Sequence, residues 1–344
     1  MSTDPNQAKG YSGDTNVGYG LFAVKGDNVT KYVLKGKFPK ARFMSVQTYN
    51  TRFQKHVDSI LDVAIEPDPG SENPFRPGVD MDTEKRDFTL ELVPETFYTG
   101  APNQLKMAKG NLNHNFFYRI YSPQEGVTLT EDDLPRVSAV DAATNQPVDC
   151  PKMIKMPEYL KFPQFMVNLV ARFQPFEFKS KSGVVGSNAG IPAYLYALQE
   201  MERADVVVVR FKAPRFLNNR KIDDEFPESD PKTSDVRYWS FCLQNFVRNE
   251  TLACLPDFLA TPDSDGMVTL IVGTGDDVKQ AALAKGFNFL PDARVKKQKV
   301  LGFVYRNVLP NKTFASQNMY QGDYFPEGTQ CLKTDFLAGK CGLP

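Results

Sequence analysis

Short apolar runs alternate with turn residues along the whole chain, which is the pattern of a protein built mainly from strands. The runs are rich in Val, Phe, Tyr, Ile and Leu, and residues that favour turns bound them. The 23 Gly and 25 Pro divide the chain further. The pattern predicts strands at residues 31–37, 42–49, 61–66, 87–93, 116–121, 205–212, 236–244, 267–273 and 300–306.

Helical patterns are few and short. Residues 276–285 form the best candidate, because acidic residues occupy the first turn and Gly286 follows the end. Residues 191–203 also have helical propensity, although the alternation of Tyr194 and Tyr196 around Leu195 is compatible with a strand. We therefore expect helices to be minor elements of the fold.

One stretch of the chain occurs twice. Residues 42–68 align without a gap on residues 237–263. The identical pairs are Arg42/Arg237, Ser45/Ser240, Asn50/Asn245, Asp62/Asp257, Pro67/Pro262 and Asp68/Asp263. Further matches join residues 88–90 to 268–270, 103–105 to 288–290 and 118–119 to 305–306, at offsets that drift as loop insertions would make them.

The repeat predicts an all-β, mainly antiparallel fold made of two tandem β-sandwich or jelly-roll-like modules with few short helices. The modules are expected at residues 12–150 and 190–344, and the 344 residues suit two domains of ordinary size. The segment 151–189 is predicted to be a packed connector, because residues 162–170 are too apolar for a free linker.

Alternation within the repeated strand assigns two faces. Met44 and Val46 in the first copy, and Trp239, Phe241 and Leu243 in the second, belong to the core face. The opposite face is mixed aromatic and polar, and we call it the mixed face: Phe43, Ser45, Gln47 and Tyr49 in the first copy; Tyr238, Ser240, Cys242 and Gln244 in the second. It either lines a groove or module interface that binds a ligand, or is a half-solvated sheet face.

The candidate ligand-binding residues come from this face and its surroundings: Gln47, Tyr49, His114, Tyr238, Gln244 and Arg237. Aromatic and amide side chains suit a small-molecule or glycan-like ligand. Arg42 and Arg237 open the repeated strands, with Asp62 and Asp257 at equivalent later positions, and an arginine held by an aspartate would pin two strands. An anion site is the alternative for these arginines.

No catalytic motif is present, so the sequence leaves open whether the chain is an enzyme. His114 is a possible general base or a surface-loop residue, and His56 is the only other histidine. With two histidines and no C-x-x-C spacing, we expect no metal site, and nothing indicates a cofactor.

The five cysteines suggest an oxidising compartment. A hairpin centred on residues 248–249 would place Cys242 opposite Cys254, and Cys331 and Cys341 bracket a short segment, so two disulfides are predicted and Cys150 is left over. Five reduced thiols are the alternative. We expect a mature periplasmic or extracellular protein with its signal peptide absent, and a cytoplasmic location as the alternative.

Charge and hydropathy limit the classes of partner that we expect the chain to bind. The 41 basic and 41 acidic residues balance, which gives no basic footprint for nucleic acid. No apolar run approaches the ~20 residues that span a bilayer. Exposed strand edges would allow self-association.

Residues 36–45, 67–75, 236–242 and 306–310 resemble an uncharacterised family of bacterial exported proteins, and the likeness covers most of the chain. Lys40 and residues 47–50 depart from the family's pattern, in which a His and a Tyr-Asp ending are common. The resemblance implies two β-sandwich modules and export, and it implies no activity. The leading hypothesis is an exported binding protein for a small-molecule or glycan-like ligand at or between the modules. The alternatives are a hydrolase or lyase with its site in the inter-module cleft, and a structural subunit of an extracellular assembly.

Overall fold

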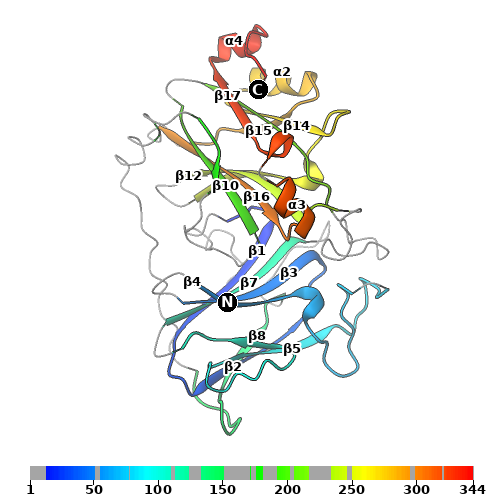
Figure 1. Ribbon diagram of the computed structural model, residues 1–344, viewed down its shortest axis with the longest axis vertical. Helices are drawn as coiled ribbons and strands as arrows, with labels where there is room; N and C mark the ends of the chain where they lie inside the picture. Colours follow the sequence, from blue (N-terminus) through cyan, green and yellow to red (C-terminus); the bar gives the residue numbers. More distant parts are fainter. Residues whose placement is uncertain are drawn as a thin grey trace.

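The computed structural model describes residues 13–50, 55–76, 78–109, 113–123, 133–150, 171, 176–180, 192–201, 205–216, 234–245, 250–294, 299–319 and 321–343. Within them the chain forms two sandwiches of two sheets each, stacked as four layers (Figure 1). The two inner sheets face each other in the middle of the molecule. This arrangement confirms the predicted fold class of two mainly antiparallel β-modules with few short helices.

Module 1 is the sandwich nearer the N-terminus. Its inner sheet has the order β1-β7-β3-β4, and its outer sheet has the order β6-β5-β2-β8. The strands are β1 (Val17–Lys25), β2 (Thr30–Lys37), β3 (Ala41–Asn50), β4 (Lys55–Leu61), β5 (Asp87–Val93), β6 (Gln104–Lys106), β7 (Asn113–Pro123) and β8 (Arg136–Asp141), and the 3-10 helix η1 spans Asp62–Ala64.

Module 2 repeats this plan. Its inner sheet is β13-β12-β16-β10-β9, and its outer sheet is β15-β14-β11-β17. The strands are β9 (Lys179–Ser180), β10 (Pro192–Glu200), β11 (Val206–Lys212), β12 (Tyr238–Asn245), β13 (Glu250–Pro256), β14 (Met267–Gly273), β15 (Asn288–Pro291), β16 (Val300–Val308) and β17 (Glu327–Cys331). The helices are α2 (Asp276–Ala284), α3 (Lys312–Gln317), α4 (Lys333–Leu337), η3 (Asp257–Leu259) and η4 (Gly322–Tyr324).

The repeated sequence occupies equivalent places in the two modules. In each outer sheet an antiparallel strand carries one parallel edge strand, β5 with β6 and β14 with β15. An asparagine braces each edge in the same way. Asn103 Nδ2 donates to Thr89 O at 2.8 Å, and Asn288 Nδ2 donates to Thr269 O at 3.2 Å. The weak sequence matches outside residues 42–68 are therefore equivalent structural positions.

Each sandwich has its own apolar core, formed by the predicted core face. Met44 and Val46 are fully buried between the sheets of module 1, and Trp239 and Phe241 are buried between those of module 2. Helices α2 and α4 cover the outer sheet of module 2, where Val278 and Phe336 pack on the strands. Burial of large aromatic and aliphatic side chains stabilises both cores.

Two sequence interpretations change. The predicted strand at residues 61–66 is the end of β4 followed by η1, because the chain turns there to direct Asp62 inward. Residues 192–200 form strand β10, so the helical interpretation of 191–203 is wrong. The segment pairs with β16 on one side and β9 on the other, and such pairing overrides its helical propensity. The predicted helix at 276–285 is confirmed as α2.

Most of the predicted connector 151–189 lies outside the described residues. Of its described part, β9 joins the inner sheet of module 2, and Phe178 is buried in the core of that module. The exact limits of the modules stay a prediction. No helix among the described residues is both long enough and apolar enough to cross a membrane.

Candidate functional site

The two mixed faces meet in the middle of the molecule. Phe43 and Tyr121 of module 1 pack with Tyr238, Val308 and their neighbours of module 2. The Tyr121 and Tyr238 rings lie 5.7 Å apart in an edge-to-face arrangement. Every residue of β3 and of β12 is buried. The mixed face is thus not a half-solvated sheet surface, and any function of its residues is exercised in the interior between the modules.

Two buried ion pairs join the modules reciprocally. Arg42 Nη1 lies 2.6 Å from Asp257 Oδ1 and 2.7 Å from Oδ2, and Arg237 Nη2 lies 3.1 Å from Asp62 Oδ2. Each arginine therefore pairs with the aspartate of the other copy, and both pairs are almost inaccessible to solvent. Burial raises the pKa of Asp257 to about 6, against the opposing effect of Arg42. Arg237 is consequently a residue of the module interface.

Each aspartate also fixes a strand of its own module. The backbone N–H of Met44 donates to Asp62 Oδ2 at 3.2 Å, and that of Trp239 donates to Asp257 Oδ2 at 3.1 Å. A repeated arginine, a repeated aspartate and a repeated strand thus form one pseudo-twofold joint. This explains why these positions are identical in the two copies.

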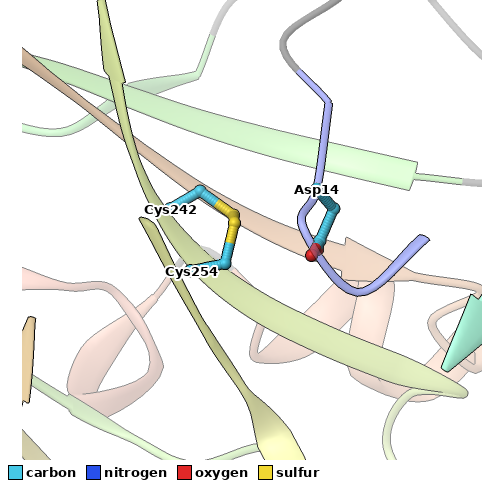
Figure 2. A group of neighbouring side chains, drawn as sticks. All are labelled: Asp14, Cys242 and Cys254. Carbon is cyan, nitrogen blue, oxygen red and sulfur yellow. A yellow bond between two sulfur atoms is a disulfide. The ribbon is translucent and has the colours of Figure 1, made fainter. Parts of the chain in front are cut away.

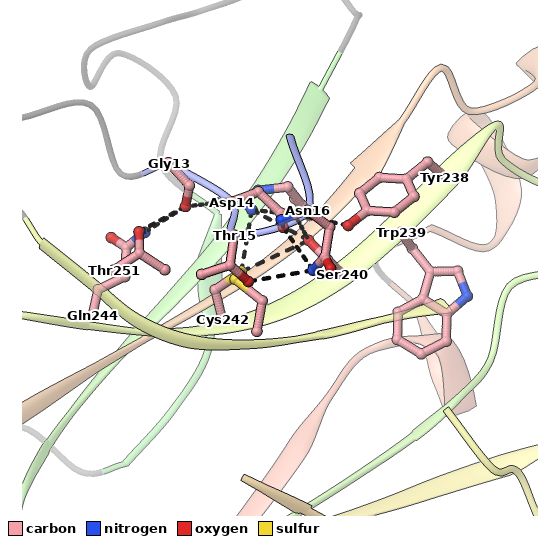
Figure 3. A network of polar contacts seen from close by, with 12 residues as sticks. Gly13, Asp14, Thr15, Asn16, Tyr238, Trp239, Ser240, Cys242, Gln244 and Thr251 are labelled. Carbon is pink, nitrogen blue, oxygen red and sulfur yellow. Dashed lines mark hydrogen bonds and ion pairs between the residues drawn. A yellow bond between two sulfur atoms is a disulfide. The ribbon is translucent and has the colours of Figure 1, made fainter. Parts of the chain in front are cut away.

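A second polar cluster lies on the mixed face of module 2, where it holds the chain just before β1. Asp14 Oδ2 accepts hydrogen bonds from Ser240 Oγ at 2.5 Å and Tyr238 OH at 2.9 Å (Figure 3). It also accepts one from Arg306 Nη1 at 2.7 Å. The preceding carbonyl of Gly13 accepts from Thr251 Oγ1 at 2.8 Å. A carboxylate of module 1 therefore fills an arginine site of module 2.

The charge of Asp14 is stabilised in this position. Burial alone would raise the pKa of the carboxyl group, but the charge of Arg306 and the hydrogen bonds from Ser240 and Asn16 outweigh it and hold the pKa below the usual value. Burial likewise opposes the charge of Arg306, but Asp14 and nearby tyrosines raise the pKa of its guanidinium. The two groups form a permanent ion pair at neutral pH.

The sulfur atoms beside Asp14 belong to a disulfide. Asp14, Cys242 and Cys254 place potential ligand atoms within 4.8 Å of one another. Cys242 and Cys254 are directly paired across β12 and β13 and bonded to each other (Figure 2). A disulfide provides no thiolate, and the Asp14 oxygen is occupied by Arg306, so this group does not have the ligands of a metal centre.

Module 1 carries the counterpart of the Asp14 site. In its inner sheet, Arg119 of β7 pairs with Tyr19 of β1 and with Ser45 of β3. In module 2, Arg306 pairs in the same way with Tyr194 and Ser240. Side chains directly opposite on neighbouring strands share a face. The row Tyr19–Arg119–Ser45 is therefore equivalent to Tyr194–Arg306–Ser240.

Three buried polar atoms on this face of module 1 lack hydrogen-bond partners among the described residues, two of them in the row and one on the neighbouring residue Gln47. Arg119 Nη1, Ser45 Oγ and Gln47 Nε2 are buried and make no hydrogen bond within the described part of the chain. The residues themselves are 8 %, 0 % and 0 % exposed. Buried polar groups are nearly always paired, and leaving one unpaired costs about 1–3 kcal/mol. All three atoms are hydrogen-bond donors on one sheet face.

Aromatic rings border these donors. The Arg119 guanidinium lies 4.7 Å from the centroid of Phe117 and 5.9 Å from that of Tyr49, with which Arg119 also hydrogen-bonds. The Tyr49 hydroxyl donates to Gln47 Oε1 at 2.8 Å, which leaves the amide nitrogen of Gln47 free to donate elsewhere. We call Ser45, Gln47, Tyr49 and Arg119 the module 1 site.

The predicted site residues separate into four groups. Gln47 and Tyr49 lie together in the module 1 site. Tyr238 and Gln244 lie in its counterpart, where Tyr238 binds Asp14 and Gln244 Nε2 lies 3.4 Å from the Gly13 carbonyl oxygen. Arg237 belongs to the interface. His114 lies on the opposite face of β7 from Arg119, with its ring 6.3 Å from that of Phe116, so it does not face the other predicted residues.

His114 is a buried residue of a strand, which differs from the surface-loop interpretation. It is 1 % exposed, and burial lowers its pKa to about 4. Its Nδ1 has no partner among the described residues. His56 contacts the Tyr49 ring edge-to-face, with ring centroids 5.7 Å apart, and burial lowers its pKa as well. His56 is therefore nearer than His114 to the module 1 site.

Sequence reasoning missed the central residues of both sites. Residues 118–119 and 305–306 were matched within the repeat, and the shared arginine was the available signal. The sequence match did not show that this arginine lies on the mixed face, because that follows from the strand register, which places Arg119 opposite Ser45. Asp14 precedes the repeated segment, and nothing in the local sequence indicated that it reaches the other module.

The comparisons with known proteins show the fold only. No family model and no curated protein matches the chain. The structure of an uncharacterized protein from Burkholderia cenocepacia is similar with a TM-score of 0.60 and 14 % identity, covering 96 % of this chain and 79 % of that one. A protein from Vibrio parahaemolyticus aligns with a TM-score of 0.48 and 10 % identity over 93 % and 90 % of the two chains. The first similarity extends over both modules of the chain.

The predicted disulfides are confirmed. Cys331 is bonded to Cys341 near the C-terminus, in addition to the Cys242–Cys254 bond across the hairpin. Cys150 is free and exposed. Two short-range disulfides are typical of a protein that matures in an oxidising compartment.

An open hollow of about 970 Å³ lies on the opposite side of module 2, against its outer sheet. Arg210 and Lys212 of β11 line it together with Asp323 and Glu327. Arg210 is paired with Asp263 at 3.3 Å, and both side chains are partly exposed. Paired charges of both signs on an open surface are typical of a solvated face, and the hollow contains none of the predicted site residues.

Proposed function

We propose that the chain is an exported, non-enzymatic binding protein that holds a small ligand at the module 1 site, between the two modules. The observation that carries the proposal is the group of three unpaired buried donors on Arg119, Ser45 and Gln47. Their counterpart in module 2 is satisfied by a group from another part of the chain. A ligand would satisfy the donors of module 1 in the same manner.

The surroundings suit binding better than catalysis. The aromatic rings of Tyr49 and Phe117 border the donors and offer an apolar surface to the rest of a ligand. His114, the general-base candidate, lies on the other face of the strand and is neutral at physiological pH. The disulfides support export to the periplasm or the cell exterior.

Two arginines provide a matched test of this location. We would screen small metabolites and oligosaccharides by thermal shift against the wild type, Arg119→Gln and Arg210→Gln. Arg119 belongs to the module 1 site, and Arg210 belongs to the outer hollow. We expect at least one compound to raise the Tm of the wild type and of Arg210→Gln, but not that of Arg119→Gln. Hits that survive in Arg119→Gln and disappear in Arg210→Gln would transfer the site to the outer hollow, and a screen without hits would contradict ligand binding.

A further inference from the structure

The pseudo-twofold relation between the modules also identifies the chemistry of the ligand. We infer that the module 1 site binds the carboxylate of a small organic acid, in the place that Asp14 fills in module 2. This inference rests on the proposed function and adds the ligand class to it. Three observations support it. The two sites share an arginine and a serine, the Asp14 carboxylate accepts hydrogen bonds from this pair in module 2, and no described carboxylate does so in module 1.

The shared residues form a carboxylate receptor in the site whose occupant is visible. One oxygen of Asp14 accepts from the Arg306 guanidinium and the Ser240 hydroxyl, both at hydrogen-bond distance. Arg119 and Ser45 are the equivalent pair of module 1, directly opposite each other in the same strand register. Charged hydrogen bonds of this type are about twice as strong as neutral ones, so the pair discriminates in favour of an anion.

The described residues supply no carboxylate to the arginine of module 1. Tyr19 and Tyr194 are the residues directly opposite Arg119 and Arg306 in the two sheets, so these positions are equivalent. Arg306 has the carboxylate of Asp14 as its partner, whereas Arg119 Nη1 has no partner among the described residues. A ligand carboxylate would supply this acceptor in the place that Asp14 fills in module 2.

The differences between the sites indicate a ligand larger than a free ion. Gln47 stands where module 2 has Cys242, which is engaged in a disulfide, and Tyr49 stands where it has Gln244. Module 1 therefore carries its amide two residues from Ser45, where module 2 has the disulfide, and has an aromatic ring where module 2 has its amide. These groups suit a polar substituent and an apolar or sugar-ring surface next to the carboxylate.

The test compares acids with their neutral counterparts in calorimetric titrations of the full chain. The probes are acetate against acetamide, succinate against succinamide, and D-glucuronate against D-glucose, with inorganic phosphate as a tetrahedral anion. We expect at least one acid to bind at least tenfold more tightly than its neutral counterpart and than phosphate. Equal or tighter binding of the neutral compound would retain the proposed function and overturn the carboxylate inference. Tighter binding of phosphate would also overturn it.

Two serines give the matched variants. Ser45→Ala removes a donor from the module 1 site, and Ser240→Ala removes the equivalent donor from the site that Asp14 already fills. We expect about tenfold weaker binding of the acid to Ser45→Ala and unchanged binding to Ser240→Ala. Equal weakening by both variants would place the acid elsewhere and overturn the inference. Binding of none of the acids at millimolar concentration would overturn the carboxylate inference, whereas the proposed function would be overturned only by a thermal-shift screen without hits.

Discussion

At the scale of residues, three buried ion pairs lie in the interior between the modules, beside the apolar cluster around Phe43 and Tyr238. Arg42, Arg237, Arg306 and their carboxylates are all buried, and each guanidinium is matched by an aspartate from the other module. A buried ion pair contributes little net stability compared with apolar residues, but breaking it leaves an unpaired charge in the interior. The pairs therefore specify how the modules join.

Removing one charge of the joint should be costly. Arg42→Gln leaves Asp257 buried without its cation, and we expect a loss of about 3–5 kcal/mol in the free energy of unfolding, measured by urea denaturation. The control is Arg210→Gln, which breaks a partly exposed pair with Asp263 and should cost about 0–1 kcal/mol. Similar losses in both variants would contradict the role assigned to the interface pair.

The Asp14 pair should depend on pH in a defined direction. Because the folded state lowers the pKa of Asp14 below 3.8, its contribution is fully present above that pH and is lost as the pH falls through the folded pKa. The difference in unfolding free energy between the wild type and Asp14→Asn should thus be constant from pH 7 to pH 5 and shrink below about pH 4. A difference that grows on acidification would contradict the assignment.

At the scale of elements, strand β12 is held by strand pairing, by a disulfide and by side-chain hydrogen bonds. It pairs with β16, carries the disulfide to β13, and presents Ser240 and Tyr238 to Asp14. The alternation of its residues was sufficient to predict which face is core. It could not predict that the opposite face meets the other module, because that depends on packing between distant segments.

The disulfides can be counted directly. Unfolded without reductant, the chain should take up one thiol label, on Cys150, and after reduction it should take up five. Cys254→Ala should lower the stability by about 2–4 kcal/mol, because it opens a closed loop. Five labels without reductant would refute both disulfides and the argument for export.

The interpretation of residues 191–203 shows where local sequence is insufficient. Propensity favoured a helix, and yet β10 lies between β16 and β9 with Leu195 in the core. Residues 192–200 form a strand because they hydrogen-bond to strands at residues 179–180 and 300–308, and this pairing cannot be seen in the local sequence. Helix α2 lies on the surface of its module and depends on local signals, and it was predicted correctly.

At the scale of the whole molecule, the duplication builds four stacked sheets and brings the inner sheets of the two modules together (Figure 1). The sequence sufficed to predict the repeat, the fold class and the disulfides. The site required the register of β3 with β7, which places Arg119 beside Ser45. It also required the position of Asp14, which precedes the repeated segment in the sequence.

The joint should make the modules unfold together. Separating them would expose the apolar cluster around Phe43 and Tyr238 and would part both reciprocal ion pairs. We therefore expect one transition in scanning calorimetry for the wild type, and two for the double variant Arg42→Ala/Arg237→Ala. Two separate transitions in the wild type would contradict a joint that couples the modules.

We propose that the molecule has two equivalent carboxylate sites, one that Asp14 fills and one that a ligand fills. The most direct measurement is equilibrium dialysis with the isotopically labelled acid that binds most tightly in the calorimetric titrations, for the wild type and for Asp14→Ala. We expect one molecule bound per chain in the wild type and two in the variant, because the substitution vacates the site at Arg306. No acid bound to the wild type, or the same number bound to both proteins, would contradict the two equivalent sites.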